Sequence, residues 1–205
     1  MKKLLLSLLV FAAACAQPAD SKLDTKPDMP MATDAQAVLA DNADLFRQIL
    51  ASKGEDPTQA LTPGRPLPVI AVRADELSKF DGTTDLAPLF HTTPERWFPL
   101  FGRAGAPIGS VTLRNTNGQW VMTRAGSPTL THALVEARAS LPPDTDEVGL
   151  VRVAELGTDF LAVKNGDDIA LVALYDNDEL GLHARAIAPA VAVMTRLAPA
   201  AARLH

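Results

Sequence analysis

Three strand patterns follow one another closely in the C-terminal half of the chain, and they limit the fold more than any other feature. Gly149–Glu155 and Asp159–Lys164 alternate apolar and polar side chains, whereas Ile169–Tyr175 is apolar on both faces. Gly157 and the Asn-Gly-Asp-Asp sequence at 165–168 supply turn residues between the three runs. A strand that is apolar on both faces is typical of the centre of a sheet. The patterns therefore predict three strands in close order, with Ile169–Tyr175 as the central strand.

A hairpin is predicted upstream of these strands. Ile108–Arg114 and Gln119–Arg124 also alternate, and the sequence Asn-Thr-Asn-Gly at 115–118 separates them. Asn-Gly between two alternating runs is a strong hairpin signal. Val69–Val72 is expected to form a further short strand, followed by a helical turn over 74–80.

Helical patterns occupy much of the remaining chain. Pro128–Leu141 repeats apolar residues on one helical face and is followed by two prolines. A last helix is expected to start near Pro189 and to bend or end before Pro199. The sequence Thr-Pro-Glu-Arg that opens Thr93–Phe101 is typical of a capped helix start with proline at the first helical position, so a helix is expected there too.

From Thr93 onward the expected order is helix, two strands, helix, three strands, helix. This order, with its apolar last strand, resembles the roadblock and profilin-like topologies, whose five-stranded antiparallel sheet has the last strand in the middle. The resemblance rests on no residue motif and implies no function. The predicted fold class is α+β, an antiparallel sheet of about five strands packed with helices.

The N-terminus predicts a cleaved leader that ends just before Cys15, the only cysteine of the chain. Two lysines precede Leu4–Ala14, an apolar run of 11 residues, whereas a membrane-spanning helix needs roughly 17–25 residues. The sequence Ala-Ala-Ala-Cys that ends at Cys15 resembles the lipobox of bacterial lipoproteins. The resemblance implies cleavage before Cys15 and acylation of its thiol, a palmitate-type lipid anchor. It also implies sorting to the outer membrane of a Gram-negative cell, because the next residue, Ala16, is not aspartate.

An ordinary secretory leader is the alternative. Ala12-x-Ala14 or Ala14-x-Ala16 would then be the cleavage site, and Cys15 would have no special role. A single unpaired thiol in an exported protein calls for an explanation, and acylation supplies one. In either case no second cysteine is present to form a disulfide within the chain.

The predicted domain organisation has three segments. Residues 1–14 are a signal peptide, 15–32 are the lipidated cysteine and a flexible tether rich in Pro, Asp and Lys, and 33–205 are a single α+β domain. The domain begins with a helix that ends near Gly54. Its apolar stripe either packs on the domain or binds a partner.

The charge balance excludes one class of partner. The net charge is −5, and losing Lys2 and Lys3 with the leader would leave 17 basic and 24 acidic residues, a net charge of −7. No basic patch stands out, so nucleic-acid binding is not predicted. Anionic lipid should not attract the domain beyond its acyl anchor.

No residue pattern predicts catalysis, a cofactor or a metal. Ser110 and Ser127 lack the G-x-S-x-G context of a nucleophile elbow. The acidic runs at 144–147 and 176–179 do not continue into a complete calcium loop. The histidines lack the spacing of a zinc motif; they are His91, His132, His183 and His205.

Aromatic residues offer the one candidate ligand or partner surface. Trp97, Phe98 and Phe101 are clustered in sequence, and Trp120 lies on a predicted hairpin strand. Core packing explains such a cluster most simply, and an apolar groove is the alternative. The predicted function is therefore a lipid-anchored envelope protein that acts as an interaction or assembly module with an envelope protein partner. A periplasmic sensor or carrier of a small molecule or lipid is the alternative, and a hydrolase with a dispersed site is a third hypothesis.

Overall fold

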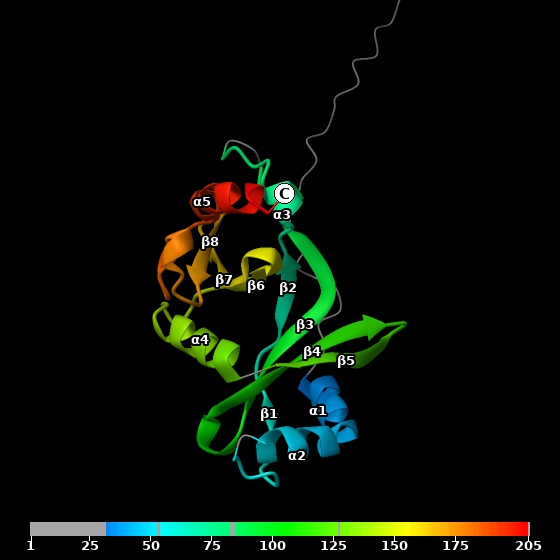
Figure 1. Ribbon diagram of the computed structural model, residues 1–205. Coiled ribbons are helices and arrows are strands. Elements are labelled where there is room, and N and C mark those ends of the chain that lie inside the picture. The colour runs from blue at the N-terminus through cyan, green and yellow to red at the C-terminus, as the bar shows by residue number, and fades with distance from the viewer. Residues whose placement is uncertain (1–31, 53, 83–84, 127, 205) are drawn as a thin grey trace, which may run out of the picture.

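The computed structural model describes residues 32–52, 54–82, 85–126 and 128–204 (Figure 1). Within these residues, nine strands form one sheet in the order β5-β4-β3-β2-β6-β7-β8-β9, and β1 pairs beside β3. All pairings are antiparallel except that of β2 with β6. The strands are β1 (Thr62–Pro63), β2 (Leu67–Ala71), β3 (His91–Phe101), β4 (Pro107–Thr116), β5 (Gln119–Gly126), β6 (Glu147–Val153), β7 (Thr158–Asn165), β8 (Asp168–Ala173) and β9 (Ile187–Pro189).

Five α-helices within the described residues cover the two faces of the sheet (Figure 1). Helix α4 packs on one face, against β2, β3, β6, β7 and β8. On the other face, α1 and α2 cover β3 and β4, while α3 and α5 cover β6, β7 and β8. None of the described helices is both long and apolar enough to span a lipid bilayer. The helices are α1 (Ala32–Asp41), α2 (Ala43–Ser52), α3 (Ala74–Leu77), α4 (Pro128–Ala139) and α5 (Ala190–Ala202).

The α+β class and the C-terminal strand patterns are confirmed. The three predicted runs are β6, β7 and β8, and the predicted hairpin is β4–β5. In the hairpin, Thr116 pairs with Gln119, and the two turn residues have positive φ, 53° at Asn117 and 83° at Gly118. Positive φ at both central residues is the type I′ geometry that Asn-Gly favours. The signal peptide, Cys15 and most of the predicted tether lie outside the described residues.

The predicted sheet size and strand order need correction. Within the described residues the sheet has nine strands rather than about five, and β8, the strand predicted to be central, lies next to the edge strand β9 rather than in the middle. Strand β8 is apolar on both faces because each face has its own helix. Val172 packs in the α4 cluster, and Leu171 packs in the cluster that contains α5. Apolarity on both faces therefore indicated helices on both sides and not a central position.

The helix expected at Thr93–Phe101 is wrong, because this segment is strand β3. It pairs with β2 on one side and β4 on the other. Its alternation buries Trp97 under α4 and Phe98 under α1, with exposed fractions of 1% and 0%. The burial of two large aromatics on opposite faces outweighs a local helix-start signal, because packing routinely overrides propensity.

The N-terminal stripe packs on the domain, as the simpler alternative predicted. Instead of one helix it forms α1 and α2, and the break is at Asn42, whose Nδ2 donates to the Val38 carbonyl at 2.8 Å. Gly54 follows α2 with φ 73°, and the Glu55 N–H reaches the Leu50 carbonyl at 3.0 Å. That 6→1 bond is typical of a helix C-terminus with a left-handed glycine.

One of the two sequence-based alternatives expected α5 to end before Pro199. The helix does not end there. It continues to Ala202. A proline inside a helix costs about 3 kcal/mol, and burial on both sides of it offsets this cost. Leu197 and Ala201 are both fully buried against the sheet.

Candidate interaction surface

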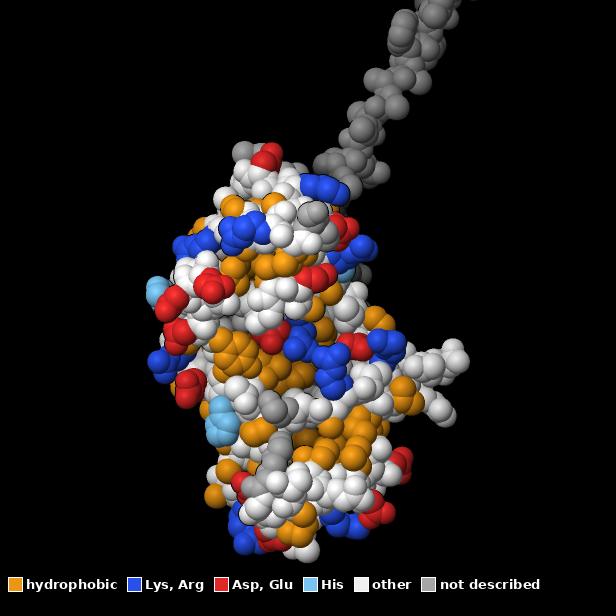
Figure 2. Space-filling model, viewed as in Figure 1, with side chains coloured by type: hydrophobic (Ala, Val, Ile, Leu, Met, Phe, Trp, Pro, Cys, Tyr) orange, Lys and Arg blue, Asp and Glu red, His pale blue; other side chains and the backbone are white. Residues whose placement is uncertain are grey.

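Three arginines lie on the part of the α4 face that the helix leaves open. Arg124 on β5 is level with Trp97 across the sheet, and the Trp97 ring packs in the α4 cluster. Thr112 of β4 pairs with both Trp97 and Arg124, and Arg114 lies two residues beyond it on the same face. Arg152 lies two residues beyond Leu150 on β6, and Leu150 belongs to the α4 cluster. In Figure 2, Lys and Arg side chains gather between α4 and the β4–β5 hairpin. We call this region the arginine surface; it consists of Glu95, Arg114, Arg124, Arg152, Asp159 and Tyr175.

Two carboxylates hold two of these arginines. Arg114 Nη2 lies 2.7 Å from Glu95 Oε1. Arg152 makes a two-point contact with Asp159, with Nε at 2.7 Å from Oδ1 and Nη2 at 3.3 Å from Oδ2. Arg124 has no ion pair among the described residues. Three guanidinium groups against two carboxylates give the arginine surface one excess positive charge on a chain whose net charge is −5.

Tyr175 completes the arginine surface just beyond β8. Burial raises the pKa of its hydroxyl, the Asp159 carboxylate raises it further, and the Arg152 guanidinium acts in the opposite direction. The hydroxyl is therefore a protonated hydrogen-bond donor at neutral pH. Arginine and tyrosine are enriched at protein interfaces, where planar and amphipathic groups contribute most to binding.

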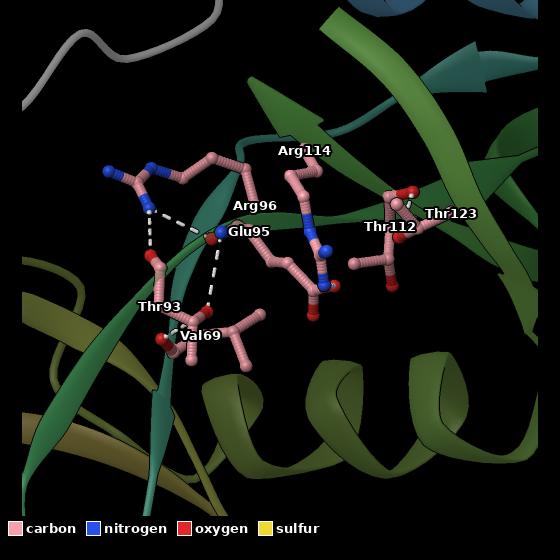
Figure 3. A network of polar contacts seen from close by, with 7 residues as sticks. All are labelled: Val69, Thr93, Glu95, Arg96, Thr112, Arg114 and Thr123. Carbon is pink, nitrogen blue, oxygen red and sulfur yellow. Dashed lines mark hydrogen bonds and ion pairs between the residues drawn. The ribbon is translucent and has the colours of Figure 1, made fainter. Parts of the chain in front are cut away.

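A polar network in β2 and β3 fixes the backbone beneath Glu95 (Figure 3). Thr93 Oγ1 donates to the Val69 carbonyl at 2.9 Å and accepts from the Glu95 N–H at 3.3 Å. Arg96 Nη1 donates to the Thr93 carbonyl at 3.1 Å and the Glu95 carbonyl at 2.8 Å. These bonds hold the irregular register where β2 meets β3. Arg114 and Glu95 lie on one side of β3 and Arg96 on the other (Figure 3).

Arg96 itself is buried, with 2% of the residue exposed. Burial lowers the pKa of its guanidinium. Its Nε has no acceptor, and no carboxylate among the described residues pairs with it. Arg96 Nη1 thus donates to two main-chain carbonyls, and both belong to the strand segment that carries Glu95.

The structure does not bring the sequence-predicted aromatic residues together. Trp97 and Phe98 are buried on opposite faces of β3, Trp97 in the α4 cluster and Phe98 in the α1 cluster. Phe101 and Trp120 are half-buried, and Trp120 packs against the α1 cluster. Trp97 and Phe98 therefore act as core residues, which is the simpler interpretation of the aromatic run.

The serines and histidines considered for chemistry are also separate. Ser110 is 3% exposed inside β4, and Ser127 and His205 lie outside the described residues. His91 Nε2 contacts Glu76, while His132 and His183 are exposed. Among the described residues, no three histidine, cysteine or acidic side chains are arranged to hold a metal ion.

Side chains of the two acidic runs accept hydrogen bonds from main-chain groups of their own loop or form an ion pair at the surface. Asp176 Oδ1 accepts from the Ala184 N–H at 2.9 Å, and Asn177 Oδ1 accepts from the Leu180 N–H at 3.2 Å. In the other run, Asp146 pairs with Lys164 Nζ at 3.0 Å. Their oxygens thus have local structural partners, as expected for loops that join elements.

A cavity of about 330 Å³ lies between α1, α2 and the segment that precedes β1. Apolar groups such as Leu39 and Phe46 line it together with the polar groups of Gln36, Arg47 and Gln59. Neither tryptophan lines it, so it is not the apolar groove that the sequence suggested as an alternative for the aromatic residues.

The arginine surface was missed from sequence because its six members come from five different strands and from the segment just after β8. The pair Arg114–Glu95 spans 19 residues, and the segment that carries Glu95 was expected to be a helix. The pair Arg152–Asp159, only seven residues apart, was within reach. Pairing the two predicted strands antiparallel across Gly157 places these opposite charges in register.

A scan against protein-family models, a search of the curated proteins and a search of the solved structures each found no match. No family therefore assigns an activity to the chain.

Proposed function

We propose that this chain is a lipid-anchored cell-envelope protein whose domain acts as an interaction or assembly module. Cys15 would carry the acyl chains, and the segment between Cys15 and α1 would tether the domain to the periplasmic side of the outer membrane. Two or more acyl chains hold a protein stably, whereas one holds it only marginally. The lipobox-like sequence that ends at Cys15 supports the anchor.

The arginine surface is the observation that carries the interaction role. It gathers three arginines and a tyrosine on an open sheet face, and one of them, Arg124, has no carboxylate partner among the described residues. Complementary charge speeds encounter and selects partners. The partner expected from this chemistry is an envelope protein that presents acidic side chains.

Membrane fractionation tests the anchor. The wild-type chain should be recovered with the outer membrane, and Cys15→Ala should be soluble in the periplasm. Recovery of Cys15→Ala with the membrane at the wild-type level would contradict lipid anchoring through this thiol.

Site-specific photo-crosslinking in cells tests the interaction role. A crosslinking residue at Val121, which is 43% exposed and level with Arg114, should give a discrete protein adduct. The adduct should be lost with Arg114→Glu and Arg124→Glu together. The matched control is Ile187 on β9, which is 51% exposed on the opposite edge of the sheet. Identical adducts from both positions, or an adduct that survives the charge reversals, would contradict the proposal.

A sensor or carrier of a small molecule or lipid is the second candidate, and the cavity beside α2 favours it. Its volume of about 330 Å³ is at the lower end of ligand pockets. A panel of envelope lipids and metabolites would be tested by thermal shift against the wild type and Ala43→Trp, which places an indole in the cavity lining. A ligand that stabilises only the wild type would support this role, and equal stabilisation of both would exclude the cavity.

A further inference from the structure

Strand β5 is the one long open edge of the sheet in the part of the chain that the structure describes. It comprises eight residues, and among the described strands it pairs only with β4. The opposite edge is β9, which has three residues, ends in Pro189 and runs directly into α5. Short edge strands and prolines are common protections against further strand pairing. Residues 119–126 contain no proline, lysine or acidic residue.

The regular part of this edge is next to the turn. Gln119–Met122 pairs residue by residue with β4, and Thr123 is the extra residue of a bulge before Arg124. In an antiparallel strand, alternate residues turn their N–H and C=O groups away from the existing partner. The bulge therefore limits a regular added strand to about four or five residues. The hairpin projects beyond α1, so its end is open to approach (Figure 1).

The side chains beside this edge define what an added strand should carry. Val121 is 43% exposed and offers an apolar contact. Arg124 is exposed on the same face and has no ion pair among the described residues, so it calls for a carboxylate. A second copy of β5 would supply no carboxylate, because the strand contains none. Charge complementarity thus favours an acidic segment of another protein over a second copy.

We propose that the open edge of β5 takes an extended acidic segment of a partner protein as an additional strand. Main-chain hydrogen bonds to Gln119–Met122 would supply affinity, and a carboxylate at the end of the added strand, within reach of Arg124 just beyond the bulge, would supply selectivity. This inference rests on the proposed interaction role and names the partner chemistry for it.

A short peptide tests the strand directly on the purified chain. The probe is the capped peptide Thr-Glu-Thr-Val-Thr-Glu-Thr, which places Glu, Val and Glu on one face. Two matched peptides differ in one property each. One has lysine in place of glutamate, and the other has N-methyl groups on alternate amides, which keep the charges but block pairing. Binding is measured by anisotropy, and the bound edge is located by amide hydrogen exchange.

The acidic peptide should bind about tenfold more tightly than either matched peptide, a difference of about 1.4 kcal/mol. Amides within Gln119–Met122 should exchange more slowly in its presence. Arg124→Glu should weaken binding about tenfold. Arg203→Glu, an exposed charge reversal at the end of α5, should not weaken binding.

Equal binding of the acidic and N-methylated peptides would overturn strand addition while leaving the interaction role of the arginine surface intact. Absence of binding by the acidic peptide would also overturn it, and the crosslinking experiment at Val121 would then decide the interaction role separately. Slower exchange at β9 instead of β5 would overturn the assignment of the edge.

Discussion

Gly149 lies where the two halves of the sheet meet, and replacing it with alanine should weaken the pairing between them. Among the strands that the structure describes, the pairing of β2 with β6 is the single strand pairing that joins the β5-β4-β3-β2 half to the β6-β7-β8-β9 half. A Cβ at Gly149 would lie 2.7 Å from the Pro68 carbonyl oxygen and 3.1 Å from Ile70 Cδ1. A relaxed contact of this kind needs about 3.4 Å or more. The shortfall is therefore about 0.7 Å against a main-chain atom, which no side-chain rotation relieves.

We expect Gly149→Ala to lower the free energy of unfolding by about 1–3 kcal/mol, the usual cost of forcing one methyl group into a packed core. For a chain of this size, each kcal/mol lowers the melting temperature by about 2–4 °C. Urea unfolding would be followed by tryptophan fluorescence, because Trp97 is buried in the cluster that β2 and β6 share.

A double-mutant cycle with Ile70→Val identifies the atom responsible. Ile70→Val removes Cδ1 but leaves the Pro68 carbonyl in place, and alone it should cost about 0.5–1.5 kcal/mol. If the carbonyl is the obstacle, the two costs should add to within about 0.5 kcal/mol. Rescue of Gly149→Ala by Ile70→Val would show that the Pro68 carbonyl is not the obstacle. A cost for Gly149→Ala below about 0.5 kcal/mol would refute the clash itself.

Three further changes test the turn and the arginine surface. Asn117→Ala places alanine at φ 53° in the hairpin turn, so it should cost about 1–2 kcal/mol in thermal unfolding, and a loss no greater than that of Thr116→Ala would contradict the turn assignment. Asp159→Asn removes the carboxylate from a pair whose side chains are 29% and 14% exposed, so urea unfolding should show a loss of about 1.5–3 kcal/mol, whereas a loss under about 0.5 kcal/mol would mean that the pair is solvated. Tyr175 is the only tyrosine, and its raised pKa means that the folded chain retains that proton above pH of about 10, where the unfolded chain releases it. The free energy of unfolding should therefore fall as pH rises through this range, and it should fall less in Tyr175→Phe. A titration of phenolate absorbance with a midpoint near the ordinary tyrosine pKa would contradict the raised pKa of Tyr175.

The elements that could be predicted from sequence are those whose partners are close in the chain. Strands β6, β7 and β8 follow one another through short turns, and β4 and β5 are joined by Asn-Gly, so local alternation determined both their existence and their pairing. The β2–β6 pairing joins Val69 to Leu150, and no turn signal reports a contact over that separation. The parallel link, and with it the full strand order, therefore could not be read from local patterns.

Strand β3 shows a second limit of local patterns. Its start carries a helix-type cap signal, Thr-Pro-Glu-Arg, and the same threonine bonds across the sheet instead, from Thr93 Oγ1 to the Val69 carbonyl. A hydroxyl that can cap a helix can equally satisfy a carbonyl on a neighbouring strand. The burial of Trp97 and Phe98 decides between these states, and it depends on helices that are remote in sequence.

The arginine surface crosses the link between the two halves of the sheet. Glu95, Arg114 and Arg124 belong to the first half, while Arg152 and Asp159 belong to the second. Arg152 is held from both directions, since its carbonyl accepts the Val72 N–H at 2.9 Å and its guanidinium pairs with Asp159.

A partner that contacts both halves would bind only the state in which β2 and β6 are paired, and it would therefore stabilise that pairing by mass action. Gly149→Ala should then reduce the adduct from Val121 even though Gly149 lies away from the hairpin. An unchanged adduct would restrict the partner to the β4–β5 half, where strand addition alone would hold it. The same core substitution thus distinguishes a partner that spans the arginine surface from one that binds only its edge.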